Sequence, residues 1–196
     1  MDDGQVQTVG RLASETWRTQ EGEFRPFLSA DELENLTIRR GTLTKAEREI
    51  INHHIVMTIR MLEALPWPPH LTQVPEYAGG HHERMDGKGY PRGLTREQMS
   101  VPARVMGIAD IFEALTARDR PYKPGKTLTE SLRILGHMKL EGHVDPDLFD
   151  IFVKERVFLD YAHRFLPPEQ IDRVDWAKIP GVSAELAAWM SESEPR

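Results

Sequence analysis

The sequence HHERMDGKGYPRGL, at residues 81–94, joins two adjacent histidines to a run of residues that favour turns. The turn-forming positions are an aspartate, a proline and three glycines, namely Asp86, Gly87, Gly89, Pro91 and Gly93. This density of turn formers predicts a loop over residues 86–100. The fold must therefore be built from the segments that lead into this loop and out of it.

A short helix is predicted before the loop, over residues 74–83. Gly79 and Gly80 lie inside it, and each glycine costs a helix about 1 kcal/mol relative to alanine. We therefore expect another backbone or a ligand to come close there. On a helix, the adjacent His81 and His82 would project about 100° apart, so the pair would serve two neighbouring ions, or one ion and a substrate.

A longer helix is predicted upstream, over residues 44–65. Thr44 and Glu47 form the Thr-x-x-Glu pattern of a capping box at its start. Pro66 ends the helix, because proline lacks the backbone donor that a helix interior needs. One face carries residues at helical spacing, with a histidine among mainly apolar side chains: Ile50, Ile51, His54, Met57, Thr58, Met61, Leu62 and Leu65.

Helical patterns continue after the loop. Pro102 suits the first turn of a helix, and an apolar stripe follows from it: Val101, Val105, Ile108, Phe112 and Leu115. A second stripe of small residues surrounds the carboxylate of Asp110. Further helices are predicted from a Ser29 or Asp31 cap to about Ile38, at 127–141 and at 146–156. Neither an internal repeat nor an alternating strand pattern is present, so the predicted fold class is all-α.

The chain divides into three predicted parts. Residues 1–28 form an N-terminal segment without strong periodicity, and residues 29–156 form a helical domain. Residues 157–196 form a C-terminal extension of short helices, ending in the polar tail SESEPR, which we expect to be disordered.

Composition excludes several classes of protein. The 196 residues include no cysteine, which removes disulfides, thiolate metal sites and a cysteine nucleophile. No apolar run approaches the roughly 18 residues of a membrane span, and the acidic N-terminus is unlike a secretory signal. We therefore expect a cytoplasmic protein without a membrane partner. The net charge of −6 argues against binding a nucleic-acid polymer.

Charge is unevenly distributed along the chain. Between Arg84 and Lys126 there are nine basic and five acidic residues, a local charge of +4 in an acidic protein. A basic segment of this kind suits an anionic small ligand, although a solvated face of mixed charges would have the same composition.

His54, His81, His82 and Asp110 are the candidate metal ligands. Imidazole and carboxylate groups suit Fe, Mn or Zn, and two such ions about 3.5–4 Å apart can hold a phosphate and activate water. Each residue also has an ordinary structural explanation. His54 could be a core histidine, the His81–His82 pair could face solvent, and Asp110 could pair with Arg104.

Residues 81–94 resemble the signature of the HD-GYP phosphodiesterases, a branch of the HD superfamily of metal-dependent phosphohydrolases. Flanking segments resemble the same family: LTKAEREIINHH at 43–54, PARVMGIADIFEALTARDRPYK at 102–123 and DPDLFDIF at 145–152. The resemblance covers about residues 31–152 and implies part of the HD-superfamily helical bundle.

The resemblance also implies roles for individual residues. His54, His81, His82 and Asp110 match the family's metal ligands, and catalysis would depend on His81, His82 and Asp110. Iron or manganese would be the metal, with Zn, Ni and Mg as alternatives. The implied substrate is cyclic di-GMP, hydrolysed through pGpG to GMP, and its contacts would come from Gly89, Tyr90, Pro91, Arg120 and Lys123. The Gly-Tyr-Pro loop would also dock a signalling protein.

One part of the family pattern is missing. The family is named for a His-Asp dyad upstream of the equivalent of His54, whereas this sequence has no histidine before His53 and no His-Asp dipeptide. We expect the chain to begin part-way through the family domain, with a homodimer or a second chain covering the helix over residues 47–65. Two alternative functions follow: a binding module without catalysis, and an HD-type hydrolase of another phosphorylated nucleotide.

Overall fold

The computed structural model describes residues 1–39, 41–118 and 125–193. It is mainly helical, which confirms the predicted all-α class. The chain separates into two compact units, Met1–His54 and Ile55–Arg196. No helix in the described ranges is both long and apolar enough to cross a membrane.

The first unit consists of short elements with exposed surfaces. Helix α1 (Asp3–Ala13) leads into strands β1 (Thr16–Arg18) and β2 (Phe24–Pro26), which pair antiparallel, and α2 (Ala30–Leu36) and α3 (Lys45–Asn52) follow. Capping boxes at Ser29 and Thr44 start α2 and α3, which confirms both predicted helix starts. Residues 1–28, which show no strong periodic pattern in the sequence, contain this helix and hairpin. The hairpin left no alternating pattern because its three-residue strands are exposed on both faces.

The predicted helix over residues 44–65 is two helices. Helix α3 ends at Asn52, and His53 caps it, with its N–H donating to the carbonyls of Glu49 and Ile50. Helix α4 (His54–Glu63) then begins.

Exposure along these two helices also differs from the predicted stripe. Much of the stripe is exposed, namely Ile50, Ile51, Met57, Met61 and Leu65. The buried residues of α4 are instead Ile55 and Ile59, on a neighbouring face.

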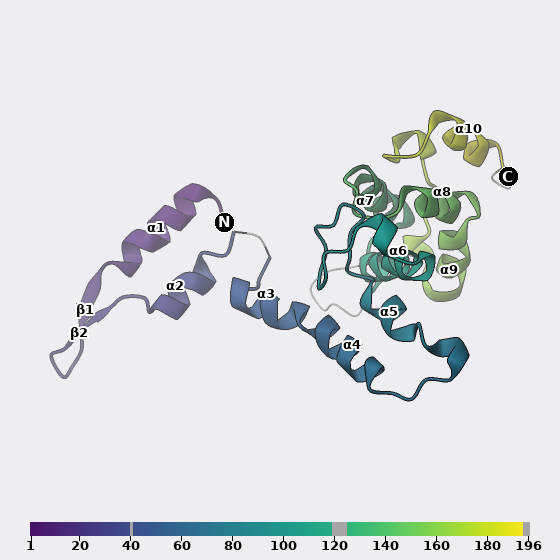
Figure 1. Cartoon of the computed structure of the whole chain (residues 1–196). Coiled ribbons are helices and arrows are strands. Elements are labelled where there is room, and N and C mark those ends of the chain that lie inside the picture. The colour runs from purple at the N-terminus through teal and green to yellow at the C-terminus, as the bar shows by residue number, and fades with distance from the viewer. Residues whose placement is uncertain (40, 119–124, 194–196) are drawn as a thin grey trace. The chain divides into compact units, whose positions relative to one another are not determined.

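The second unit holds the core of the protein. After α4 come α5 (Val74–Gly79), α6 (Val101–Thr116), α7 (Leu128–Leu140), α8 (Pro146–Lys154), α9 (Val157–Phe165) and α10 (Ala184–Glu192). Helix α6 packs against α5, α7 and α8 (Figure 1). Short 3-10 turns complete the unit at Pro69–Leu71, Arg96–Gln98, Pro168–Gln170 and Trp176–Lys178.

An apolar cluster in the described part of the chain joins α6, α7, α8, α9 and α10. Ile108 and Phe112 of α6 meet buried side chains from α7, α8, α9 and the segment after them, including Leu132, Leu135, Phe149, Phe158 and Trp176. Val101 and Val105 of the predicted α6 stripe are exposed, so only the later part of that stripe faces the core. Helix α10 continues through Glu192, so the tail predicted to be disordered is helical over its first two residues.

Asp145 connects the loop before α6 to the start of α8. Its side chain is fully buried and caps α8 by accepting hydrogen bonds from the N–H groups of Asp147 and Leu148, at 2.9 and 3.2 Å. It also accepts a hydrogen bond from Arg96 at 2.9 Å and one from Arg104. The carboxylate of Asp145 thereby links the loop before α6, helix α6 and the start of α8.

Candidate metal centre

The two adjacent histidines lie in a turn and not on a helix. Helix α5 ends at Gly79, and His81 and His82 follow its cap, so the predicted helix through Glu83 is wrong. The two glycines pack tightly: a Cβ on Gly79 would lie 2.8 Å from Ile59, and one on Gly80 would lie 2.8 Å from the Cβ of Ala103. The closest approaches therefore come from side chains of α4 and α6, where another backbone or a ligand was expected. In the turn, the two imidazoles are released from helical spacing and can face one point.

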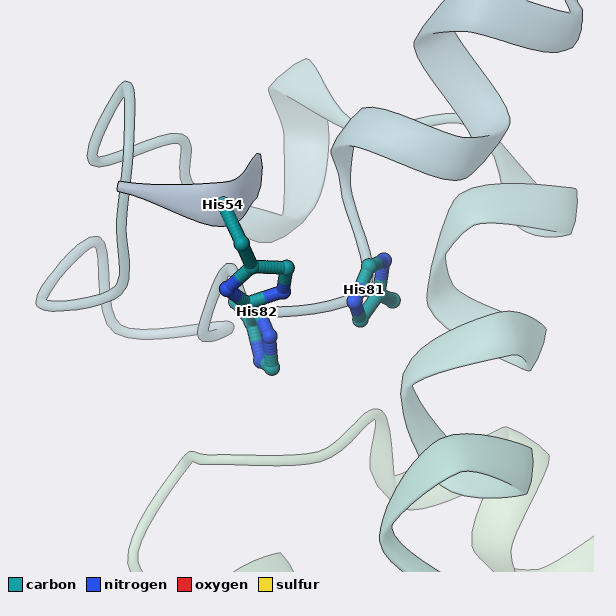
Figure 2. A group of neighbouring side chains, drawn as sticks. All are labelled: His54, His81 and His82. Atoms are coloured by element: carbon teal, nitrogen blue, oxygen red, sulfur yellow. The ribbon is translucent and has the colours of Figure 1, made fainter. Parts of the chain in front are cut away.

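Three imidazoles come together at this turn. His54, the first residue of α4, lies with His81 and His82 so that one nitrogen from each is within 4.8 Å of the others (Figure 2). The rings of His81 and His82 are 4.1 Å apart between centroids. Nitrogens bound to one ion lie roughly 3–4 Å apart at metal–nitrogen bonds of about 2.1 Å. Small side-chain shifts would therefore bring the three nitrogens onto a single ion.

Backbone carbonyls orient two of the three rings. Nδ1 of His54 lies 2.6 Å from the carbonyl oxygen of Ile51, and Nδ1 of His81 lies 2.6 Å from that of Ala78. A carbonyl oxygen only accepts hydrogen bonds, so each Nδ1 carries a proton, and Nε2 is the nitrogen that can bind a metal. Histidines that bind metals are commonly held by such a second hydrogen bond. The donor set thus suits a divalent ion.

Tyr90 fixes the third ring. Its ring stacks on His82 with centroids 4.8 Å apart, and its N–H donates to the carbonyl of His82 at 3.2 Å. The Tyr90–Pro91 peptide bond is cis. Burial raises the pKa of Tyr90, and the nearby carboxylate of Asp110 raises it further. Tyr90 therefore lies between the histidine turn and α6.

Two carboxylates hold the loop that carries Tyr90. The buried Glu83 accepts hydrogen bonds from the N–H groups of Arg92 and Leu94, at 2.7 and 2.9 Å. Asp86 receives two hydrogen bonds from Arg84, and these bonds hold the pKa of Asp86 far below its usual range.

Glu83→Gln is expected to lower the free energy of unfolding by about 1–2 kcal/mol, because the amide offers one acceptor where the loop presents two donors. Amide hydrogen exchange should rise most at Arg92 and Leu94. The exposed Glu97, in the same loop, provides the matched control as Glu97→Gln. Equal exchange in the two variants would contradict a structural role for Glu83.

A cavity of about 470 Å³ adjoins the histidine turn. Its lining includes His81, His82, Tyr90 and Asp110, together with Arg84, Lys88, Gly89, His143 and an apolar wall from α6. Asp110 therefore shares the cavity, although it is not one of the residues grouped within 4.8 Å. Arg104, which could have paired with Asp110, bonds Asp145 instead. Arg120 and Lys123 lie outside the described residues.

Sequence reasoning missed His143. It follows α7 and has no spacing relationship to the other histidines. Burial lowers the pKa of His143, and the charge of Arg84 lowers it further, which favours the neutral ring. No local pattern could have identified it, because its place in the cavity depends on contact with a loop far away in the sequence.

Comparison with known proteins decides the family. A family model described as an HD domain matches residues 30–148. The chain belongs to the HD domain family.

Among curated relatives, this HD domain chain is 46% identical over 79 residues to a 3'3'-cGAMP-specific phosphodiesterase of Vibrio cholerae, a match that covers 40% of the chain. It is 40% identical over 114 residues to a cyclic di-GMP phosphodiesterase of Pseudomonas aeruginosa, covering 58% of the chain. It is 35% identical over 133 residues to one of Thermotoga maritima, covering 67% of the chain.

These relatives are much longer proteins. The matches cover 18%, 26% and 35% of their respective lengths. Their names agree with the resemblance to the HD-GYP phosphodiesterases found in the sequence, and this resemblance is confirmed.

Proposed function

We propose that this HD domain chain is a metal-dependent phosphodiesterase that hydrolyses cyclic di-GMP through pGpG to GMP. The observation that carries the proposal is the group of three imidazoles within 4.8 Å of one another at a turn that lines a cavity. Relatives named as phosphodiesterases of two cyclic dinucleotides support the same substrate class.

His54, His81, His82 and Asp110 are proposed to hold the metal, which we expect to be iron or manganese. A divalent ion bound there would supply a Lewis acid for the attacked phosphate and would lower the pKa of a bound water. With three imidazoles, one carboxylate and no His-Asp dipeptide in the sequence, we expect about one ion per chain.

The surrounding residues are proposed to position ligands and exclude water. The carbonyls of Ile51 and Ala78 keep Nε2 of His54 and His81 in the ligating form. Tyr90 keeps His82 in place by stacking. Ile111, Ala114 and Leu115 give the cavity an apolar wall suited to a base. Gly89, Pro91, Arg120 and Lys123 stay proposed substrate contacts.

Hydrolysis is tested with purified protein loaded with Mn²⁺ or Fe²⁺ and incubated with cyclic di-GMP. We expect pGpG and GMP to form, and His81→Ala to reduce their formation by about 100-fold or more, because loss of a partner behind a ligand already costs about 10–100-fold. Bound metal should fall with activity. The exposed His163 on α9 provides the control as His163→Ala, which should change neither quantity. Equal product from wild type and His81→Ala would refute the proposal.

The missing dyad favours one alternative, a module that binds the dinucleotide or a signalling partner without hydrolysis. Calorimetry separates the two functions. Saturable binding of cyclic di-GMP without product would support the binding module, whereas turnover that depends on His81 would support the enzyme.

A further inference from the structure

A cyclic dinucleotide carries two phosphodiesters, and only one of them can be at the metal centre during a single hydrolytic step. The other phosphate remains charged and needs donors elsewhere in the same cavity, since burying an unpaired anion is costly. Resting on the proposed function, we propose that His143 and Lys88 form the subsite for this second phosphate.

The cavity lining narrows the choice of donors. Among the described lining residues, Asp110 is an anion, and Ile111, Ala114 and Leu115 offer no side-chain donor. His81 and His82 are assigned to the metal. The remaining charged or imidazole donors in the described lining are Arg84, Lys88 and His143.

Arg84 is already committed to another carboxylate. Its Nε and one terminal nitrogen donate to the two oxygens of Asp86 at 3.0 and 2.8 Å, a bidentate pair in which both side chains are about three-quarters buried. Such planar two-bond pairs are among the stronger ion pairs in proteins. Arg84 therefore acts as a support for the loop, and its charge is largely compensated by Asp86.

Lys88 supplies a positive charge that can move to a ligand. Its Nζ lies 3.7 Å from Asp86 and its side chain is 79% exposed, so this ion pair is weak and easily exchanged. Its backbone N–H donates to Asp86 at 3.1 Å, which fixes the start of the side chain at the cavity while the ammonium stays mobile. The charge of Arg84 is offset by its pair with Asp86 and by the nearby carboxylate of Glu141, so Lys88 is the cation in this part of the described lining that can turn to a ligand.

His143 supplies a positioned donor from the opposite segment. Its N–H donates to the carbonyl of Met138 at 2.8 Å, and its carbonyl accepts from the N–H of Met85 at 3.3 Å. The backbone is thus held both to the end of α7 and to the loop after the histidine turn. The half-buried ring of His143 lines the cavity. It is not part of the group formed by His54, His81 and His82, whose nitrogens lie within 4.8 Å of one another. Whichever tautomer it adopts, an imidazole has an N–H that can donate to a phosphate oxygen.

Two substrates test the subsite. Cyclic di-GMP has two phosphodiesters, whereas bis(p-nitrophenyl) phosphate has only one. Its hydrolysis therefore does not need a second phosphate subsite. We expect His143→Asn and Lys88→Gln each to raise KM and Kd for cyclic di-GMP about tenfold, because the shorter Asn withdraws the N–H from the phosphate and Gln replaces a charged donor with a neutral one. Hydrolysis of bis(p-nitrophenyl) phosphate and the bound metal should stay at wild-type levels.

Matched controls are His137→Asn on α7 and Lys178→Gln, both at exposed positions outside the cavity lining, and neither should alter KM or Kd. Unchanged KM and Kd in both cavity variants would overturn the subsite. An equal loss on both substrates, with loss of metal in His143→Asn, would make His143 a metal ligand and also overturn it.

The readouts separate this subsite from the proposed hydrolysis. If wild type binds cyclic di-GMP without cleaving it, the hydrolytic function fails, and weaker binding by the two variants would still support the subsite. If wild type hydrolyses cyclic di-GMP and the two variants match it in KM and Kd, the subsite fails and the function stands. No binding and no turnover by wild type would refute both.

Discussion

Replacing Asp145 by alanine is expected to lower the free energy of unfolding by about 3 kcal/mol, since removing one partner of a buried ion pair typically costs 3–5 kcal/mol. The Asp145 side chain is fully buried, while Arg96 and Arg104 keep 37% and 15% of their side-chain exposure. The partial solvation of the two arginines places the effect at the lower end of that range. In a chain of this size the melting temperature should fall by roughly 6–12 °C.

The pH dependence of this loss gives a second check. Burial alone would raise the pKa of Asp145, but hydrogen bonds from Arg96, from the N–H of Leu148 and from Arg104 outweigh it and hold the pKa below its ordinary value. A carboxyl group whose folded-state pKa lies below its unfolded value of about 3.9 stabilises the fold above that pH and loses this effect as pH falls. The difference between wild type and Asp145→Ala should therefore be full at pH 7 and shrink below about pH 4.

Asp147 provides the matched control. Its carboxylate also bonds Arg96, but its side chain is 72% exposed. An exposed ion pair is worth about 1 kcal/mol or less, so Asp147→Ala should unfold close to the wild-type denaturant concentration. Equal destabilisation by the two substitutions in urea titrations would contradict the assignment of Asp145 as the buried junction.

Local sequence signals predicted the helix starts well. The capping pairs at Ser29 and Thr44, and Pro102 in the first turn of α6, are read from three or four consecutive residues, and the structure confirms each of them. Helix ends that depend on tertiary packing were predicted poorly. Helix α5 stops at Gly79, where Ile59 and Ala103 press against Gly79 and Gly80, and neither contact is visible in the local sequence.

The candidate site follows the same division. His81 and His82 are adjacent in the sequence, so one motif was enough to nominate both. Bringing His54 to them requires α4 to pack beside the turn, and spacing alone could not predict that. His143 is brought to the cavity by backbone hydrogen bonds that join Met85 and Asp86 to residues 142 and 143, and such long-range pairing leaves no periodic signal.

Gly89→Ala is expected to displace the loop that carries Tyr90. A Cβ at this position would lie 2.4 Å from the backbone nitrogen of Arg84 and 2.5 Å from the Cα of Glu83. Both are backbone atoms next to the histidine turn, so the strain cannot be relieved by rotating a flexible side chain. Overpacking of this kind typically costs about 1–3 kcal/mol of stability.

The larger effect of Gly89→Ala should be on the proposed hydrolysis. Moving residue 89 moves Tyr90, and with it the ring that stacks on His82 and the N–H that bonds the carbonyl of His82. Misplacement of a reacting group by about 1 Å can reduce a rate about 100-fold, and we expect a loss of this size in turnover of cyclic di-GMP. Bound metal should fall less, because the carbonyls that orient His54 and His81 belong to Ile51 and Ala78, outside the displaced loop.

Gly10→Ala is the control for Gly89→Ala, since Gly10 lies in α1 and a Cβ there would meet no heavy atom within 4 Å. It should leave turnover unchanged. Wild-type turnover by Gly89→Ala would mean that the loop can move without disturbing His82, and would remove Tyr90 from the catalytic arrangement. If Gly89→Ala keeps its metal but loses turnover, metal binding and catalysis depend on different parts of the site. Metal binding would then depend on the imidazoles, whereas turnover would also depend on the loop that packs against them.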